Sequence, residues 1–248
     1  VPVATEVIQS SISDLTLNVL HDANWWWTSG TYGAKASFTR TFINTYLKLD
    51  GTPFTSDPAY RTMVFKDEVK NRDLRLKQTI RSGDYKRVSG GVQVAAPPLF
   101  SYTFTGYQPI KWTLDDTYYD AGSLNNNAIA LYRYAEVLLN YAEAKAELGT
   151  LTDADWAMTV GKLRERGGIT GGLLSKPTQV DPYLATNYFP GINDASILEI
   201  RRERGIELSL EGFRFSDLLR WKRGQLMEQE WNGFYVPSLA TPMDLNED

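Results

Sequence analysis

The residues of this chain that could recognise a ligand are mainly aromatic. Trp25, Trp26 and Trp27 are adjacent, Asn24 precedes them, and Tyr32 follows among Gly, Ser and Thr residues. Aromatic rings can stack on the apolar face of a ligand, and polar side chains around such a platform can bind its polar groups. Because three adjacent side chains cannot all face one direction, core packing is the alternative role for some of these rings. The stretch 24–32 is therefore one candidate wall of a ligand-binding site.

Trp112, Tyr118 and Tyr119 form a second candidate wall. Three carboxylates lie among them, on Asp115, Asp116 and Asp120. These rings could instead anchor a solvated loop onto neighbouring helices, and that interpretation stays open. Two carboxylates across a cleft would also suit a glycoside hydrolase, and Asp115 or Asp116 is open to that role. The candidate ligand-contacting residues are Asn24, Trp25, Trp26, Trp27, Tyr32, Trp112 and Tyr118.

The counts of cysteine and histidine remove several kinds of chemistry. The 248 residues contain 0 Cys and 1 His, which excludes disulfides, thiolate nucleophiles and zinc sites with paired imidazoles. No catalytic residue, metal site or cofactor is assigned.

The formal net charge of -4 provides no general attraction for nucleic acid. Basic residues concentrate between 201 and 223, but acidic residues alternate with them at helical spacing, which predicts an ion-paired helix face.

The candidate site residues fall in segments rich in helix-breaking residues. Gly and small polar residues make 24–33 a predicted loop, and the many Gly and Pro residues make 83–127 a region of loops and short strands. Within that region, Phe and Tyr alternate with Ser and Thr over 100–105, which predicts a strand. Residues 38–49 predict a short helix that a turn closes. The aromatic walls are therefore expected on loops that helices hold in place.

The clearest predicted elements are two helices in the middle of the chain. Apolar residues at spacings of three and four predict a helix over 128–148, which Gly149 ends. A second helix runs from about 154 to 166 with its own apolar stripe. The pair has the size of a tetratricopeptide-type hairpin.

Two further helices are predicted near the C-terminus. Asn193 or Asp194 caps the first, which extends through 210 with an interruption near Gly205, and 213–223 continues it. The predicted fold class is mainly α, with tetratricopeptide-like helical hairpins, long irregular loops and short strands.

Four stretches resemble hallmarks of the SusD/RagB family of outer-membrane nutrient-binding lipoproteins of Bacteroidetes. Residues 131–144 (LYRYAEVLLNYAEA) resemble the family's signature helix, and residues 200–221 (IRRERGIELSLEGFRFSDLLRW) resemble its second hallmark. Residues 102–112 (YTFTGYQPIKW) and 71–76 (NRDLRL) are similar to two further motifs, and the order and spacing of the four also agree. The chain departs from the family pattern at Leu74, Phe213 and Ser216.

The resemblance covers about residues 30–245, whereas family members are roughly twice as long as this chain. It therefore implies that residues 1–248 are the C-terminal SusD/RagB-like region of one larger domain whose N-terminal helical-repeat half is absent. In that interpretation, the motif residues of the hallmark helices serve as scaffold and do not touch the ligand.

The resemblance also implies a function. It points to a non-catalytic protein that binds glycan at the cell surface, through the candidate ligand-contacting residues named above, and delivers it to a SusC-like TonB-dependent transporter. A sugar presents apolar C–H faces that stack on aromatic rings, and its hydroxyl groups need polar side chains around them. The implied location is the outer membrane, through a lipid anchor outside this chain, and no nucleic-acid partner is expected. Three alternatives stay open, namely a peptide-binding member of the same family, a helical glycoside hydrolase and a helical-repeat adaptor for proteins.

Overall fold

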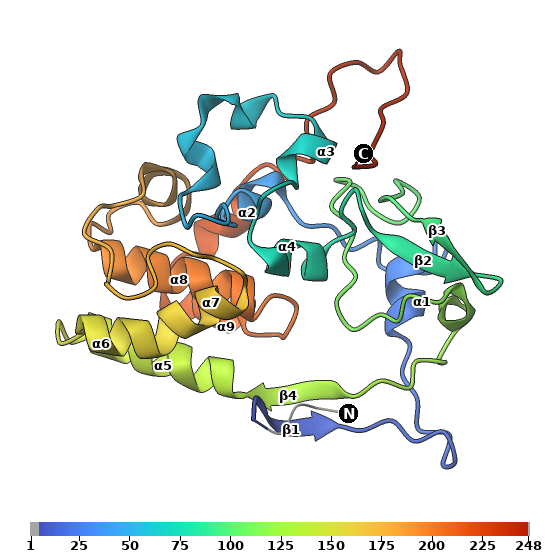
Figure 1. Ribbon diagram of the computed structural model, residues 1–248, viewed down its shortest axis with the longest axis horizontal. Coiled ribbons are helices and arrows are strands. Elements are labelled where there is room, and N and C mark those ends of the chain that lie inside the picture. The colour runs from blue at the N-terminus through green and yellow to red at the C-terminus, as the bar shows by residue number, and fades with distance from the viewer. Residues whose placement is uncertain (1–4, 248) are drawn as a thin grey trace.

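Short helices joined by long irregular segments make up most of the protein (Figure 1). The computed structural model describes residues 5–247. The α-helices are α1 (Ala23–Thr28), α2 (Arg40–Ile43), α3 (Phe65–Glu68), α4 (Leu74–Thr79), α5 (Tyr134–Glu147), α6 (Asp153–Trp156), α7 (Lys162–Arg166), α8 (Ala195–Glu207) and α9 (Arg214–Arg220). The strands are β1 (Val7–Ser11), β2 (Lys86–Ser89), β3 (Val92–Ala95) and β4 (Ile129–Arg133). Shorter 3-10 and π segments are η1 (Phe54–Ser56), η2 (Pro58–Arg61), η3 (Thr117–Asp120), η4 (Ala157–Gly161), η5 (Leu184–Tyr188) and η6 (Gly224–Glu228).

The predicted helical hairpin is present. α5 packs against α8 and against the continuous run α6–η4–α7, as the yellow and orange helices of Figure 1 show. Trp156, Val160 and Ile200 pack around the small side chain of Ala142 in one buried cluster, which lets the helices approach closely. Gly149 has a φ of 68°, the left-handed conformation that commonly ends a helix. The mainly α, tetratricopeptide-like fold class is confirmed.

The first residues of the helix predicted over 128–148 form a strand instead. β4 pairs with β1 in antiparallel orientation, with Val7 opposite Arg133. Arg133 is extended (φ -124°, ψ 150°), and α5 begins at the next residue, Tyr134. The prediction failed here because strand formation depends on a pairing partner, and that partner lies more than 100 residues away in the chain.

The strand predicted over 100–105 is wrong, because this segment is irregular. Exposure alternates over 103–105, but it is the threonines that point inward: Phe104 is 74% exposed, whereas Thr103 and Thr105 are buried. Thr105 Oγ1 donates to the carbonyl of Phe38 (2.6 Å). This segment is therefore joined to its neighbour by a side-chain hydrogen bond as well as by its backbone. The short strands of this region are β2 and β3, which pair across a two-glycine turn.

The C-terminal helices lie where they are predicted, but α8 ends at Glu207 instead of 210 and α9 ends at Arg220 instead of 223. Asp194 caps α8 by accepting a hydrogen bond from the backbone N–H of Ile197 (2.9 Å). The predicted interruption at Gly205 does not occur, since α8 continues to Glu207. A Cβ on Gly205 would lie 3.3 Å from Arg214 Nη1, so the glycine allows a close approach of the α9 side chain.

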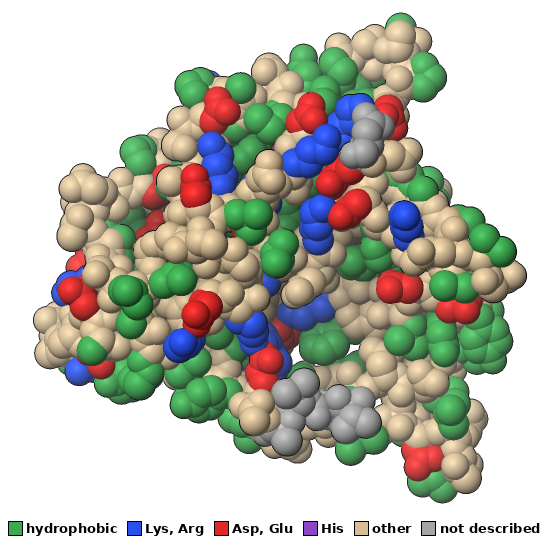
Figure 2. Space-filling view, in the orientation of Figure 1, with side chains coloured by type: hydrophobic (Ala, Val, Ile, Leu, Met, Phe, Trp, Pro, Cys, Tyr) green, Lys and Arg blue, Asp and Glu red, His purple; other side chains and the backbone are tan. Residues whose placement is uncertain are grey.

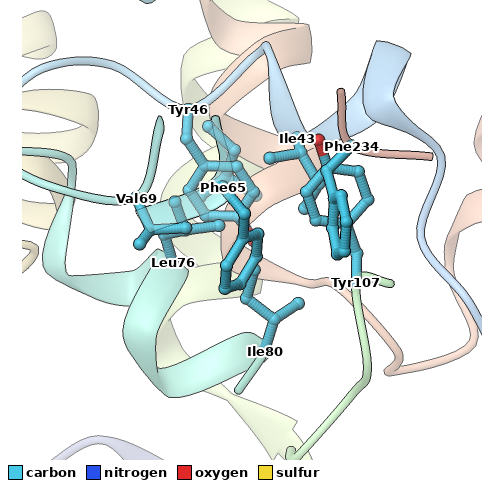
Figure 3. Packing of buried hydrophobic residues seen from close by; sticks show 9 residues of the cluster. Ile43, Tyr46, Phe65, Val69, Leu76, Ile80, Tyr107 and Phe234 are labelled. Carbon is cyan, nitrogen blue, oxygen red and sulfur yellow. The ribbon is translucent and has the colours of Figure 1, made fainter. Parts of the chain in front are cut away.

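The largest apolar core joins segments that are far apart in sequence (Figure 3). Its fully buried members are Ile43, Tyr46, Phe65, Val69, Leu76, Ile80 and Tyr107. The Tyr107 hydroxyl donates to the buried carboxylate of Glu68 (2.8 Å), and burial raises the pKa of Glu68. The helix predicted over 38–49 is limited to α2, because the chain after it turns to insert Tyr46 into this core.

Candidate functional site

Asn24 holds the first aromatic stretch in place. Residues 23–28 form α1 instead of the predicted loop, and the Asn24 side chain is buried. Its Nδ2 donates to the carbonyl of Leu114 (2.8 Å) and to Asp120 Oδ1 (3.0 Å), while its Oδ1 accepts from the Leu114 backbone N–H (2.8 Å) and from Asn125 Nδ2 (2.6 Å). These long-range bonds fix a helix where local composition predicts a loop. Asn24 therefore supports the site and has no capacity left for a ligand.

The three tryptophans point in different directions around α1, since successive helical residues diverge by about 100°. Trp27 is half-buried, and its Nε1 donates to the carbonyl of Lys111 (2.9 Å). Trp25 is also half-buried and meets the Trp26 ring edge-on, with centroids 5.3 Å apart. Trp26 is 43% exposed. Trp27 and Trp25 thus pack against the protein, and Trp26 presents the most surface of the three.

η3 lies beside α1 and carries part of the second predicted wall (Figure 1). Asp116 caps η3 by accepting from the backbone N–H of Tyr118 (2.8 Å), and Arg87 of β2 binds Asp120 at 2.7 Å. Tyr118 is 65% exposed, and its ring meets Tyr119 edge-on at 5.3 Å. The ion pair and the cap hold η3 in place, so the backbone that carries the Tyr118 ring is fixed.

We use the term aromatic lobe for α1, Tyr32 and η3 together. Tyr32 is 75% exposed. Figure 2 shows hydrophobic side chains gathered at the right of the molecule, where α1 and η3 lie. The structure thus brings parts of both predicted walls into one region, and the predicted residues with exposed rings there are Trp26, Tyr32 and Tyr118.

Trp112 lines a hollow to which no other residue of its predicted wall contributes. Its ring lines a polar hollow of about 320 Å³ between α4 and β4, visible near the middle of Figure 2. Lys111 Nζ lies 5.3 Å from the centroid of the Trp112 ring and also binds Glu211 at 2.5 Å. Burial lowers the pKa of Lys111. Trp112 has a φ of 70°, which is rare for a bulky side chain.

Charged residues of the four hallmark stretches meet beside this hollow. Arg75 binds Glu207 at 3.0 Å and also pairs with Glu203, and Arg133 binds Glu207 (2.8 Å) and Glu211 (2.7 Å). Burial acts to raise the pKa of Glu207, but the surrounding guanidinium groups lower it to about 2. Ion pairs predicted for 201–223 are present, since Arg202 pairs with Glu199 and both Arg204 and Arg220 pair with Asp217. Not every charge of that stretch is paired or buried, because Arg220 is exposed. In the described part of the chain, no group of three or more acidic or histidine side chains could hold a metal ion.

A second cavity, lined mainly by apolar residues, contains none of the predicted site residues. Its volume is about 620 Å³, and it lies among α2, η5, α8, α9 and residues 226–231; we call it the α8–α9 cavity. The aromatic residues that line it are Phe38, Phe42, Tyr188, Phe213, Phe215 and Trp231. Phe213 and Phe215 lie inside a hallmark stretch, and this was the only feature of the sequence that could have pointed to the cavity. The other walls come from distant segments, so no sequence pattern could have assembled this cavity.

Comparisons with solved structures agree with this fold. A SusD-like carbohydrate binding protein from Bacteroides fragilis is 23% identical with a TM-score of 0.64, and the match covers 94% of this chain and 45% of that protein. A second SusD-like protein from the same species is 24% identical with a TM-score of 0.60, over 88% of this chain and 44% of that one. The chain thus spans less than half the length of these relatives. No curated protein matches the chain by sequence.

A model of the SusD family matches residues 8–241. The matched region contains all four hallmark stretches and both the aromatic lobe and the α8–α9 cavity. Because the match extends over nearly the whole chain, this protein belongs to the SusD family.

Proposed function

We propose that this protein binds glycan, as oligosaccharide or polysaccharide, at the aromatic lobe. The observation that carries the proposal is the exposure of the Trp26 and Tyr118 rings on α1 and η3, which the buried Asn24 ties together. Aromatic rings with restricted motion can stack on the apolar faces of a sugar at a low cost in side-chain entropy. Family membership and the likeness to a solved carbohydrate binding protein support this function.

The proposed role is in nutrient uptake at the cell surface. The bound glycan would be delivered to a SusC-like TonB-dependent transporter, and a lipid anchor outside this chain would hold the protein at the outer membrane. The family resemblance supports this part of the proposal. Of the helices within residues 5–247, none is long and apolar enough to cross a bilayer.

We propose a non-catalytic role because the carboxylates considered for hydrolysis are engaged in local structure. Asp115 Oδ1 accepts from the Tyr85 hydroxyl (2.7 Å), and Asp116 caps η3. A glycoside hydrolase needs two carboxyl groups on either side of one bound sugar bond. These two carboxylates instead hold the segment that carries Tyr118.

Removing both exposed rings tests the proposed site. The double variant Trp26→Ala with Tyr118→Ala is expected to bind glycan about 5- to 150-fold more weakly, since each stacked ring contributes about 0.5–1.5 kcal/mol. A glycan array with the wild type identifies the ligand, and titration calorimetry then measures both affinities. The control is Tyr132→Ala, which removes an exposed ring from β4 and is expected to leave the affinity unchanged.

Three results would contradict the proposal. The first is an unchanged affinity in the double variant, which would place the site elsewhere. The second is the release of reducing ends from the bound glycan, which would favour a hydrolase. The third is binding of peptides with no binding of any glycan, which would favour the peptide-binding alternative.

A further inference from the structure

The α8–α9 cavity differs from the aromatic lobe in shape and chemistry. Its volume of about 620 Å³ is in the range of small-molecule sites, and its accessible lining is mainly apolar. Phe42 contributes to it from α2, Tyr188 from η5 and Leu208 from the end of α8. Trp231 is an exposed ring at its rim. Such a lining favours a ligand with an apolar body.

Arg214 is the distinctive charged group of this cavity. It has no acidic partner within residues 5–247, and its guanidinium lies 5.6 Å from the centroid of the Tyr188 ring and 6.0 Å from that of Trp221. The absence of a side chain on Gly205 gives it room beside α8. These neighbours hold the guanidinium in place while leaving it without a counter-charge. A planar guanidinium of this kind matches the two oxygens of a carboxylate.

The other charged groups that face the cavity are already engaged. Arg204 donates to Asp217 (2.7 Å), and Arg220 donates to the second oxygen of the same carboxylate (2.9 Å). Glu230 is exposed at the rim and accepts a hydrogen bond from Asn232 (3.1 Å). Among the described residues that line the cavity, Arg214 is therefore the cation that has no acidic partner and can bind an anion.

A hydroxyl group in the cavity also lacks a partner. Ser209 lines the cavity and is 6% exposed, and its Oγ is buried with no hydrogen bond to any described residue. Its backbone carbonyl accepts from Lys111 Nζ (2.7 Å), which fixes the residue in position. A buried hydroxyl without a hydrogen-bond partner lowers the free energy of unfolding. A polar atom of a ligand in the cavity would recover that free energy.

We propose that the α8–α9 cavity binds a small carboxylate with an aromatic or other apolar body. The carboxylate pairs with Arg214, the Ser209 hydroxyl hydrogen-bonds to the polar end of the ligand, and the body packs against Phe42 and Phe213. This site is separate from the aromatic lobe and takes a different class of ligand, so it stands independently of the proposed glycan binding.

A matched pair of probes tests the charge requirement. Titration calorimetry with 1-naphthylacetate and with its neutral amide, 1-naphthylacetamide, compares two ligands that differ only in the carboxylate. The wild type is expected to bind the acid at least tenfold more tightly than the amide. Arg214→Gln is expected to remove this preference by weakening the acid alone, whereas Trp231→Ala should weaken both probes to a similar extent.

Two control variants test whether the acid binds in this cavity. Arg61→Gln removes an exposed cation outside the cavity and should leave the affinity for the acid unchanged. Trp26→Ala in the aromatic lobe should also leave it unchanged. Equal affinity for acid and amide, no binding of either, or an unaltered preference in Arg214→Gln would overturn the proposal. If Arg214→Gln does not fold, Arg214→Lys must keep a preference for the acid, and loss of that preference counts against the site.

Discussion

At the scale of single residues, buried charge is the main feature of the hallmark stretches. Arg75, Arg133 and Glu207 come from three of these stretches and meet in one network with little solvent contact. Removing an ion from water costs several kcal/mol, and only close pairing with good geometry offsets that cost. The loss of one partner therefore leaves an uncompensated charge inside the protein. Each buried arginine of this network therefore needs a buried glutamate beside it.

Glu207→Gln is expected to destabilise the protein by about 3–5 kcal/mol at neutral pH, because the arginines around it lose a buried counter-charge. The folded-state pKa of Glu207 is about 2, below its ordinary value of 4.5. The contribution of ionised Glu207 to the free energy of unfolding is therefore fully present above about pH 5. It is lost as the pH falls from about 4.5 towards 2, and the total loss is about 3 kcal/mol. Urea unfolding of both proteins between pH 7 and pH 2.5 measures this change.

The control for this prediction is Glu165→Gln. Glu165 forms an exposed pair with Lys162 (2.7 Å), and exposed pairs contribute less than about 1 kcal/mol. A difference between wild type and Glu207→Gln that did not change with pH would show that the lowered pKa contributes nothing to stability.

At the scale of elements, local signals were reliable where a helix has its own periodicity and caps. α5 has an apolar periodicity and a glycine stop, and α8 has a side-chain N-cap; the stop at Gly149 and the cap at Asp194 agree with the prediction. Segments whose hydrogen bonds go to distant residues were predicted less well. β4 needs β1, and α1 depends on Asn24 binding residues about 90 positions away.

The N-cap of α8 provides a test at this scale. Asp194→Ala removes the acceptor for the Ile197 N–H and is expected to lower the free energy of unfolding by about 1 kcal/mol, as for other helix caps. Asp194→Asn keeps a capping oxygen and should stay close to the wild type. Equilibrium unfolding in urea compares the three proteins. Equal losses in both variants would mean that charge, not the cap, is responsible.

At the scale of the whole molecule, the segment around Gly106 joins distant parts of the chain. The Tyr107 hydroxyl bonds to Glu68, and Phe234 packs so closely that a Cβ on Gly106 would lie 1.9 Å from its Cε1 atom. Gly106 also has a φ of 85°. The glycine is therefore needed both for its conformation and for the contact between this loop and the C-terminal segment.

Gly106→Ala is expected to destabilise the fold more than Gly91→Ala. Both glycines have a positive φ, which costs an alanine about 1–2 kcal/mol, but a Cβ on Gly91 meets no atom within 4 Å. The difference between the two variants therefore isolates the clash with Phe234. Thermal and urea unfolding measure this difference. An equal loss of stability in both variants would show that the C-terminal segment can move away from a Cβ at position 106 without lowering the free energy of unfolding.

The sequence by itself determined the helical hairpin, the cap and stop residues of its helices, and the family to which the chain belongs. These properties follow from short-range spacing and from motifs that are read along the chain. The tertiary structure decided that Trp26 is more exposed than Trp25 and Trp27, that Trp112 faces a separate hollow, and that the α8–α9 cavity exists. Each of these depends on contacts between segments that are far apart in sequence, and no local pattern encodes which of those segments meet.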